Sequence, residues 1–312
     1  MINSTQDLLV NVDRKPSVAE STSPKYSDQD FSTVTLVYRS KRYEYLLYNE
    51  QLSNAALSLV DKESFTHSMV LQAQAKKYAG IIGFSESKDF NDCLLNFGFK
   101  EAGQLVLRRR YLKPFPFGKG LGLGRLSFRT MARFSNNIRH RIVEADIDKD
   151  SLATMARIYG RSQSQFDSIF SAERSMSSLE KKYMSESRKN HYVLFLRKDV
   201  GAKTDSYIVF SEHTDELNRQ TMVIEDFWTS RGGRREMAWL ITEACIWALG
   251  TGFYWVDDWT MKGSREYGVS RLLGAVRQQD MRRIFARNLD GFPPIDLSRG
   301  HFRFSDFSMV GD

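Results

Sequence analysis

The alternation of apolar and polar positions begins only after residue 30. Residues 1–30 are polar and rich in serine and show no apolar period, which predicts a flexible tail. From Phe31 onward, short β-rich runs alternate with segments of helical spacing. The runs Val34–Tyr38 and Tyr43–Tyr48 are separated by the polar stretch Arg39–Arg42 and together predict a β-hairpin.

The first half continues with helices and strands in alternation. Apolar residues at helical spacing predict a helix over Ser64–Tyr78 and a shorter helix over Phe90–Phe97 that Gly98 ends. Short apolar runs predict strands at Gly80–Phe84 and Gln104–Arg110. The expected order is therefore strand, strand, helix, strand, helix, strand.

The second half ends with the same order. Strands are predicted at Ile138–Ala145, His191–Leu196, Ser206–Phe210, Thr221–Trp228, Phe253–Val256, Arg282–Ala286 and His301–Phe304. Helices are predicted at Ser151–Arg161, Ser177–Arg188, Arg234–Leu249 and Arg265–Val276. Ser177 with Glu180 has the pattern of a capping box. Gly250 and Gly252 are expected to end the long helix.

A segment rich in proline and glycine separates the two halves. Pro114 and Pro116 precede alternating glycines from Gly118 to Gly124, whose spacing differs from that of a dinucleotide-binding loop. We interpret the segment as a flexible linker. The repeated order predicts an α+β fold with two related units, each a mixed, mostly antiparallel sheet flanked by helices, the first unit being truncated. The predicted boundaries are 1–30 for the tail, 31–112 for the N-terminal unit, 113–137 for the linker and 138–312 for the C-terminal unit.

Composition narrows the classes of site that the chain can carry. The net charge of +7 attracts anions such as phosphates, nucleic acid or acidic lipids. Because the excess is modest and spread out, we favour solubility and anion steering over dedicated nucleic-acid binding. Cys93 and Cys245 lie far apart, and the five histidines form no ligand motif, so neither a disulfide framework nor a metal site is expected. Without a long apolar stretch or a secretory signal, we expect no membrane span and a cytoplasmic location.

Residues 224–259 and residues 78–110 resemble the GNAT acyltransferase superfamily. The first segment reads IEDFWTSRGGRREMAWLITEACIWALGTGFYWVDDW and resembles the fourth strand, loop, helix and fifth strand of that fold. The second resembles its closing strand, helix and strand, and Asn96–Phe99 is similar to a Leu-Gly-Phe motif near the end of the fold. The resemblance implies that the fourth and fifth strands splay apart and that loop amides bind the pyrophosphate of coenzyme A. Tandem chains of this kind occur in polysaccharide and cell-envelope biosynthesis clusters.

The pyrophosphate loop departs from the pattern of the superfamily, which reads Gln/Arg-x-x-Gly-x-Gly/Ala. Gly233 replaces the Gln or Arg, Glu236 replaces the central Gly, and Ala238 fits. Glu236 puts a carboxylate where a pyrophosphate approaches, which weakens donor binding, and the neighbouring arginines and glycine can offset this. The resemblance thus implies acetyl-CoA or another acyl-CoA as co-substrate, bound by Trp228, Arg231, Gly232, Gly233, Arg234, Arg235 and Ala238. The loop at Asn49–Phe65 of the first half has no glycine and no basic cluster, so we expect no donor site there.

Acyl transfer to an amine needs a base and a proton donor for the leaving thiolate. The resemblance implies Glu225 as base and Tyr267 as acid, against the alternatives of a charge at a strand end and a packing tyrosine. Strand alternation predicts that Glu225 and Asp226 face opposite sides of the sheet. Asp226, Asp257 and Asp258 are candidates for binding the substrate, the last two from a loop after the fifth strand.

Arginines near the linker allow two interpretations. Arg108–Arg110 and the run from Arg133 to Arg141 are either a phosphate-binding groove between the units or a solvated face. The expected function is acyl transfer from an acyl-CoA to an amine of a small molecule, such as an amino sugar or an envelope or polysaccharide precursor. The alternatives are a non-catalytic binding or scaffold protein that has lost the donor site, and a relative that uses charged RNA as the donor.

Overall fold

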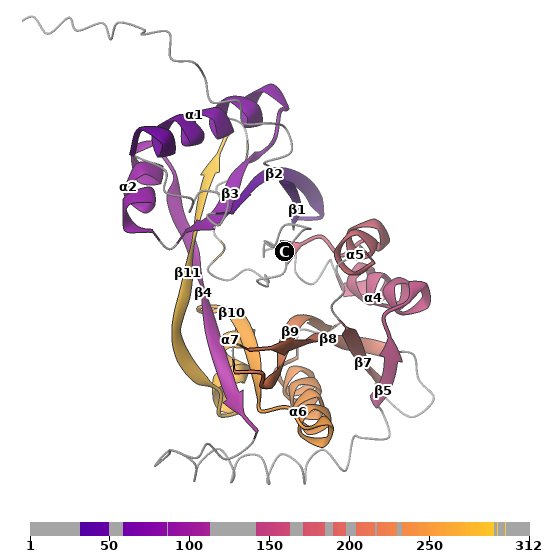
Figure 1. Cartoon of the computed structure of the whole chain (residues 1–312). Helices are drawn as coiled ribbons and strands as arrows, with labels where there is room; N and C mark the ends of the chain where they lie inside the picture. Colours follow the sequence, from indigo (N-terminus) through magenta and orange to yellow (C-terminus); the bar gives the residue numbers. More distant parts are fainter. Residues whose placement is uncertain are drawn as a thin grey trace, which may run out of the picture.

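In the computed structural model, one sheet of eleven strands runs through the described part of the chain. That part comprises residues 32–49, 59–85, 87–112, 142–162, 171–184, 190–197, 204–215, 217–229, 233–289, 292 and 297. The strand order is β5-β7-β8-β9-β10-β4-β11-β3-β2-β1-β6. Helices cover both faces (Figure 1), with α4 and α5 on one face and α1, α2, α6 and α7 on the other.

The first half follows the predicted order. The hairpin of β1 (Ser32–Tyr38) and β2 (Lys41–Asn49) is confirmed. Its turn at Arg39 and Ser40 has positive φ angles of 50° and 58°, as two-residue hairpin turns require. The other elements are α1 (Leu59–Ala75), β3 (Gly80–Ser85), α2 (Lys88–Asn96) and β4 (Lys100–Tyr111). Gly98, with a φ of 79°, follows the end of α2 as predicted.

The second half contains the predicted helices and strands with shifted ends. Its strands are β5 (Ile142–Asp146), β6 (Ser171–Ala172), β7 (His191–Arg197), β8 (Thr204–Thr214), β9 (Gln220–Thr229), β10 (Trp255–Met261) and β11 (Val276–Asn288). Its helices are α4 (Lys149–Ser162), α5 (Met176–Tyr183), α6 (Arg234–Thr251) and α7 (Arg265–Leu272). Strand β6 was not predicted, and the predicted strand His301–Phe304 lies outside the described residues.

One predicted helix start is wrong, and the predicted glycine end of α6 is confirmed at Gly252. The side chain of Ser175 accepts the first hydrogen bond of α5 from the N–H of Ser178, so Ser175 is the N-cap and Ser177 with Glu180 forms no capping box. Helix α6 continues through Gly250 and ends at Gly252, whose φ of 99° terminates it.

The final strands of the two halves are interleaved. Strand β4 of the first half lies between β10 and β11, and β11 of the second half lies between β4 and β3. One buried cluster therefore contains residues of both halves, including Leu36, Leu105, Met261 and Ile284. The halves share one core, while their description as two related units remains a prediction.

The first half also contacts the α4–α5 segment. Strand β6 pairs with the edge strand β1, with Ala172 opposite Leu36 and Ser171 opposite Val37. The guanidinium of Arg42 lies 2.8 Å from the carboxylate of Glu173 just beyond β6. The edge of the first half is therefore fixed to the helices that cover the second half.

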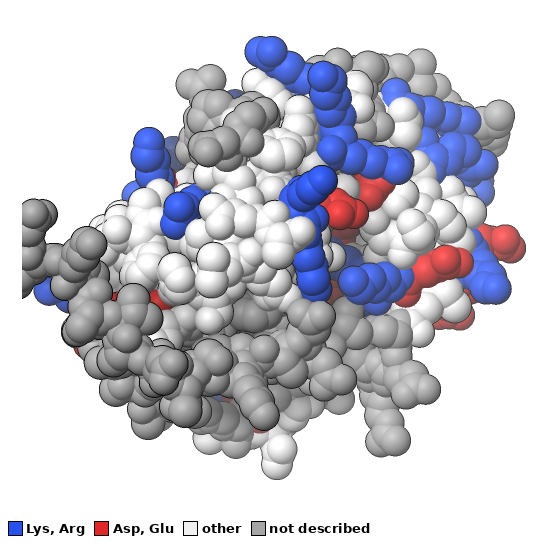
Figure 2. Space-filling view, turned by 90° about the horizontal axis from the view of Figure 1, so that it is seen from above, with Lys and Arg blue, Asp and Glu red and all other residues white. Residues whose placement is uncertain are grey.

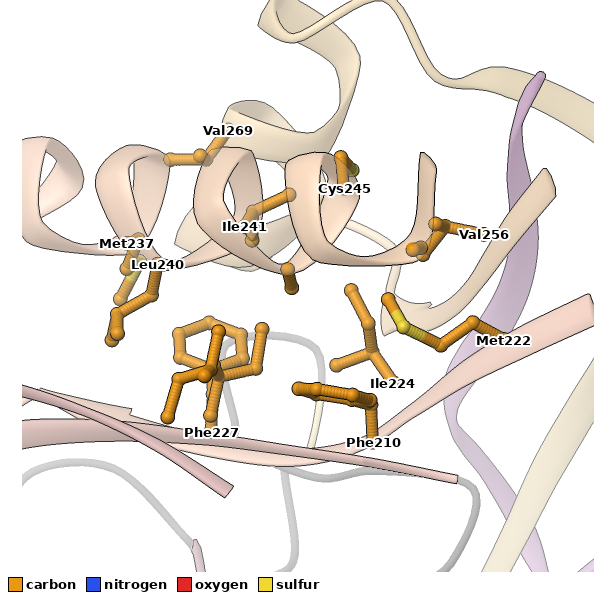
Figure 3. Close-up of a cluster of buried hydrophobic side chains, with 14 of the residues drawn as sticks. Phe210, Met222, Ile224, Phe227, Met237, Leu240, Ile241, Cys245, Val256 and Val269 are labelled. Atoms are coloured by element: carbon orange, nitrogen blue, oxygen red, sulfur yellow. The ribbon is translucent and has the colours of Figure 1, made fainter. Parts of the chain in front are cut away.

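Helix α6 packs on β8, β9 and β10 through an apolar stripe. Met237, Leu240 and Ile241 from α6 meet side chains of the sheet (Figure 3). Buried aliphatic and aromatic side chains of this kind each stabilise the fold by about 1.5–3 kcal/mol relative to exposure. This packing holds the start of α6 beside the carboxyl end of β9.

Candidate active site at the diverging strands β9 and β10

The two parallel strands β9 and β10 stay paired over only three positions. Val256, Asp257 and Asp258 pair with Met222, Val223 and Ile224. Beyond Ile224, β9 runs on to Thr229 paired with β8, and β10 runs on to Met261 paired with β4. Within these described segments the two strands are no longer paired with each other. Backbone amides and carbonyls therefore face a gap between two strands of one sheet.

A β-bulge at Glu225 begins this divergence. On β8, Val209 pairs with Asp226 and the next residue, Phe210, pairs with Ile224, so Glu225 has no opposite residue. An extra residue of this kind bends its strand and increases the local twist. In Figure 3, Ile224 and Phe227 both point toward α6, which strict alternation would not allow. The bulge thus explains why β9 leaves β10 at this point.

The bulge places Glu225 and Asp226 on the same face of the sheet. Glu225 accepts a hydrogen bond of 2.6 Å from the hydroxyl of Ser211, and Asp226 accepts one of 3.3 Å from the hydroxyl of Tyr207. Ser211 and Tyr207 are four residues apart on β8 and share the face covered by α4 and α5. The prediction of opposite faces is wrong because the extra residue reverses the alternation.

The carboxylate of Asp226 forms a buried ion pair with Arg174. Arg174 donates to both carboxylate oxygens at 2.8 and 2.9 Å, and both side chains are almost fully buried. The third nitrogen of the Arg174 guanidinium donates to the carbonyl of Ala172 in β6 at 2.8 Å. The expected contact between Asp226 and a substrate is therefore wrong, because its oxygens are bound within the protein.

The indole of Trp228 belongs to the core. Its N–H donates to the hydroxyl of Ser162 at 2.6 Å, and its ring packs edge-on against Tyr159 at 4.9 Å. Arg174 lies over the same ring at 5.1 Å. Since the side chain is 1% exposed, it cannot contact a cofactor, and any part of Trp228 in donor binding is limited to its backbone.

Helix α6 starts beside the gap with basic side chains on its first turn. Gly233 is the N-cap of α6 and, because it has no side chain, makes no capping hydrogen bond. Arg234 and Arg235 are exposed, and Arg235 lies over the ring of Trp239 at 4.5 Å. Ala238 is half-buried at the edge of the α6 cluster. Arg231 and Gly232 lie outside the described residues.

The carboxylate of Glu236 occupies the start of α6. A side chain at Gly233 would collide with it, because a Cβ atom there would lie 1.7 Å from Oε2 of Glu236. A carboxylate on the first turn of a helix is favoured by the helix dipole. The position where an incoming phosphate would meet the helix amides is thus filled by a side chain of the protein, at the residue where the sequence departs from the superfamily.

Asp257 and Asp258 lie within β10 and are buried, so their assignment to a loop is wrong. Asp257 accepts two hydrogen bonds of 2.8 Å from Arg109 and one of 3.2 Å from the indole of Trp255. This pairing occupies the oxygens that would hold a substrate. Asp258 points to the opposite face, toward α6 and α7.

Arg108 and Arg110 hold the end of α7. Arg108 donates to the carbonyl of Ala275 at 2.6 Å, and Arg110 donates to the carbonyls of Leu273 at 3.0 Å and Ser270 at 3.4 Å. Cationic side chains satisfy the last carbonyls of a helix and complement its dipole. Both readings of Arg108–Arg110 are wrong, because Arg108 and Arg110 are buried and Arg109 pairs with Asp257. The run from Arg133 to Arg141 lies outside the described residues. On the face seen in Figure 2, the described Lys and Arg side chains lie in several places, with Asp and Glu among them.

Tyr267 and Glu225 are not brought together. Tyr267 sits on the first turn of α7, half-buried, and the guanidinium of Arg108 lies 4.8 Å from its ring centroid. It therefore lies on the α7 face of the sheet, whereas Glu225 lies on the α4 face. Each borders the diverging strands from a different side.

Sequence reasoning missed three contacts that shape the site. Arg174 fixes Asp226, Ser211 fixes Glu225, and Arg110 contacts the thiol of Cys245 at 2.9 Å. Burial raises the pKa of the Cys245 thiol, although the charge of Arg110 acts in the opposite direction. Nothing in the local sequence marks these contacts, because their partners lie between 14 and 135 residues away.

The corresponding strands of the first half remain closed. Strands β2 and β3 are parallel over five positions, from Tyr45 with Gly80 to Asn49 with Phe84. Across these described residues the pair does not open. Among the described residues there is also no group of three or more His, Cys, Asp or Glu side chains that could hold a metal ion. In the part of the chain that the structure covers, no helix is both long and apolar enough to cross a membrane.

Among the comparisons with known proteins, the one with solved structures identifies the fold. No protein-family model matches the sequence, and no curated protein matches it. The structure is similar to Saccharomyces cerevisiae N-myristoyltransferase with bound myristoyl-CoA, at a TM-score of 0.56 and 10% identity over 88% of this chain and 69% of that chain. It is also similar to a GCN5-related N-acetyltransferase from Anabaena variabilis, at a TM-score of 0.52 and 9% identity over 83% of this chain and 59% of that chain. The chain therefore has a GNAT-like fold, as the sequence resemblance predicts.

Proposed function

We propose that the chain is an acyl-CoA-dependent N-acyltransferase with a single donor site, at the diverging strands β9 and β10. The donor is acetyl-CoA or another acyl-CoA, and the acceptor is an amine of a small molecule such as an amino sugar or an envelope or polysaccharide precursor. The divergence of β9 from β10 at the bulge of Glu225 carries the proposal. It leaves backbone donors next to the start of a helix, an arrangement that suits an extended anionic ligand.

The proposed reaction forms an amide bond directly. The amine nitrogen attacks the thioester carbonyl, the carbon–sulfur bond breaks, and coenzyme A leaves as the thiolate. Glu225 takes the proton that the amine loses, and its carboxylate is held for this by the hydroxyl of Ser211. Tyr267 returns a proton to the sulfur from the α7 face of the sheet, while Glu225 acts from the α4 face. Amides at the gap stabilise the negative charge that develops on the carbonyl oxygen. No covalent intermediate on the protein and no metal take part.

The start of α6 fits the donor only in part. Arg234 and Arg235 supply exposed positive charge for its phosphates. Glu236 opposes it, so the proposal requires that this side chain swings away when the donor binds. The same observation favours the alternative, in which the chain is a non-catalytic binding or scaffold protein without a donor site. The cytoplasmic location expected from the sequence is part of the proposal.

Isothermal calorimetry with acetyl-CoA, and then with a long-chain acyl-CoA, tests the donor site. We expect binding by the wild type, and a loss of roughly tenfold or more in affinity for Arg234→Glu together with Arg235→Glu. Glu236→Gln is expected to bind more tightly than the wild type, because it removes a like charge from the phosphate position.

Arg157→Glu is the matched control, since Arg157 is an exposed arginine on α4, on the other face of the sheet. It should bind the donor like the wild type. Absence of binding for every acyl-CoA, both in the wild type and in Glu236→Gln, would refute the enzyme and leave the scaffold alternative.

A further inference from the structure

Arg108 carries a buried positive charge that the proposed reaction does not yet use. It lies on β4, in the first half of the chain, and only 4% of it is exposed. Its guanidinium donates to the carbonyl of Ala275 at 2.6 Å, which is a neutral acceptor. The neighbouring Arg109, by contrast, forms a salt bridge with the carboxylate of Asp257. Because a guanidinium is costly to remove from water, the other groups that face Arg108 matter for its role.

Two side chains from other elements face the guanidinium of Arg108. The ring of Tyr267, on the first turn of α7, has its centroid 4.8 Å from the guanidinium carbon. Asp258 on β10 is directly opposite Arg108 in the pairing with β4 and points to the same face of the sheet. Burial lowers the pKa of Arg108, while Tyr267 and, less strongly, Asp258 act in the opposite direction. Tyr267 therefore contacts a buried positive charge.

This contact lies at the row of residues where β9 and β10 separate. Asp258 belongs to the last parallel pair, with Ile224, and pairs with Arg108 on its other side. Because neighbouring strands are about 4.8 Å apart, Arg108 lies roughly 10 Å from Ile224, across β10. The hydroxyl of Ser264 caps the first turn of α7 by accepting the N–H of Tyr267 at 3.1 Å. The helix cap and the guanidinium thus hold Tyr267 from two sides, next to the gap.

The proposed proton transfer moves a negative charge onto Tyr267. When the phenol protonates the thiolate of coenzyme A, its O–H bond breaks, an S–H bond forms, and a phenolate remains. The phenolate recovers a proton from water after coenzyme A has left. A cation over the ring fixes the orientation of the ring and attracts the negative charge, both on the sulfur before the transfer and on the phenol oxygen after it.

We propose that Arg108 is a positioning residue for Tyr267, which holds the phenol at the gap and stabilises the negative charge that the thiolate and the phenol exchange. The inference rests on the proposed function, because it assigns a role within the donor site. It also gives β4, a strand of the first half, a part in the chemistry of the second half.

Calorimetry with coenzyme A and with desulfo-coenzyme A, which lacks the thiol, tests this role without an acceptor. At about pH 9 a large part of an alkyl thiol is ionised. We expect the wild type to bind coenzyme A roughly tenfold more tightly than desulfo-coenzyme A, because a hydrogen bond to a charged group is gained. Tyr267→Phe and Arg108→Met should each lose most of this preference. The double variant should lose no more than Tyr267→Phe alone, because the two residues act as a unit.

Arg110→Met is the matched control. Arg110 is also buried on β4 and also holds the end of α7, but its guanidinium donates to the carbonyls of Leu273 and Ser270 and contacts the thiol of Cys245. This variant should keep the preference for coenzyme A. Thermal unfolding checks that each variant is folded. Arg108→Lys keeps the charge and carries the test if Arg108→Met does not fold, and its preference should fall between those of the wild type and Tyr267→Phe.

The outcomes separate the role of Arg108 from the donor site itself. If neither ligand binds to the wild type or to Glu236→Gln, the donor site is refuted and this inference with it. If both ligands bind equally well, if Arg108→Met keeps the preference, or if Arg110→Met loses it to the same extent, the role of Arg108 is overturned while the donor site stands.

Discussion

Asp226 and Arg174 form a buried ion pair that connects the bulge of β9 to strand β6. Two oxygens and two nitrogens meet at 2.8–2.9 Å, with the hydroxyl of Tyr207 as a further donor. Removing one partner leaves a buried charge without compensation, whereas replacing both with apolar groups does not. The pair therefore fixes the residue that follows Glu225.

This pair yields a prediction about stability. Asp226→Ala should lower the free energy of unfolding by about 3–5 kcal/mol, and Arg174→Met with Asp226→Leu should cost clearly less. Arg219→Ala, at a partly exposed pair with Asp215, should cost clearly less than Asp226→Ala. Urea unfolding measures all three. Equal costs for Asp226→Ala and Arg219→Ala would contradict the assignment of the buried pair.

Single residues also show what the sequence could not predict. The run Thr221–Trp228 has a uniform strand pattern, so the bulge at Glu225 leaves no trace in it. Its position depends on β8, where Val209 and Phe210 skip one residue of β9. Arg108 and Arg110 read as surface charges because their acceptors on α7 and beyond are more than 150 residues away. By contrast, the departure of Glu236 from the superfamily pattern can be read from the sequence, since loop spacing is a local property.

Helix α4 offers a test at the level of one element. The carboxylate of Asp148 accepts the N–H of Ser151 at 2.8 Å and caps the helix. This hydrogen bond, with the hydroxyl of Ser151, lowers the pKa of Asp148 below its ordinary value of 3.8.

A lowered pKa gives a stability contribution that is present above pH 3.8 and is lost as the pH falls through the folded-state pKa. Asp148→Asn keeps a capping side chain and removes the titration. The melting temperature of the wild type should exceed that of Asp148→Asn at neutral pH, and the two should converge on acidification. A difference independent of pH would show that the charge of Asp148 does not contribute.

At the same scale, the helices and strands of both halves were largely predictable. Hairpin turns, glycine ends and apolar spacing are local signals, and they predicted β1, β2, α2 and α6. The two-residue strand β6 was not predictable, because it exists only through its pairing with β1. Strand β10 continues beyond the predicted end at Val256, since Asp257 and Asp258 become strand residues through their pairing with Arg109 and Arg108.

At the scale of the whole molecule, β4 and β11 join the two halves into one sheet. Each lies between strands of the other half, so neither half has a complete sheet without its partner. No local pattern can reveal such pairings, because they join residues on opposite sides of the linker. The division into two units stays a prediction, and the structure shows one buried cluster with residues from both halves of the chain.

Separating the halves should therefore abolish folding. Residues 138–312 alone lack β4, which leaves the edges of β10 and β11 unpaired and prone to aggregation. We expect this fragment to be insoluble or unfolded by circular dichroism, and co-expression with residues 1–112 to restore a soluble complex. Cooperative unfolding of the isolated fragment would contradict the shared core.

Hydrogen–deuterium exchange with and without a long-chain acyl-CoA tests the central claim most directly. The donor should slow exchange in peptides covering residues 224–229 and 234–240, on either side of the gap between β9 and β10. Peptides covering residues 45–49 and 80–85, where β2 and β3 stay paired, should not change. Protection confined to the first half, or no protection at saturating donor, would contradict an acyl-CoA site at the diverging strands.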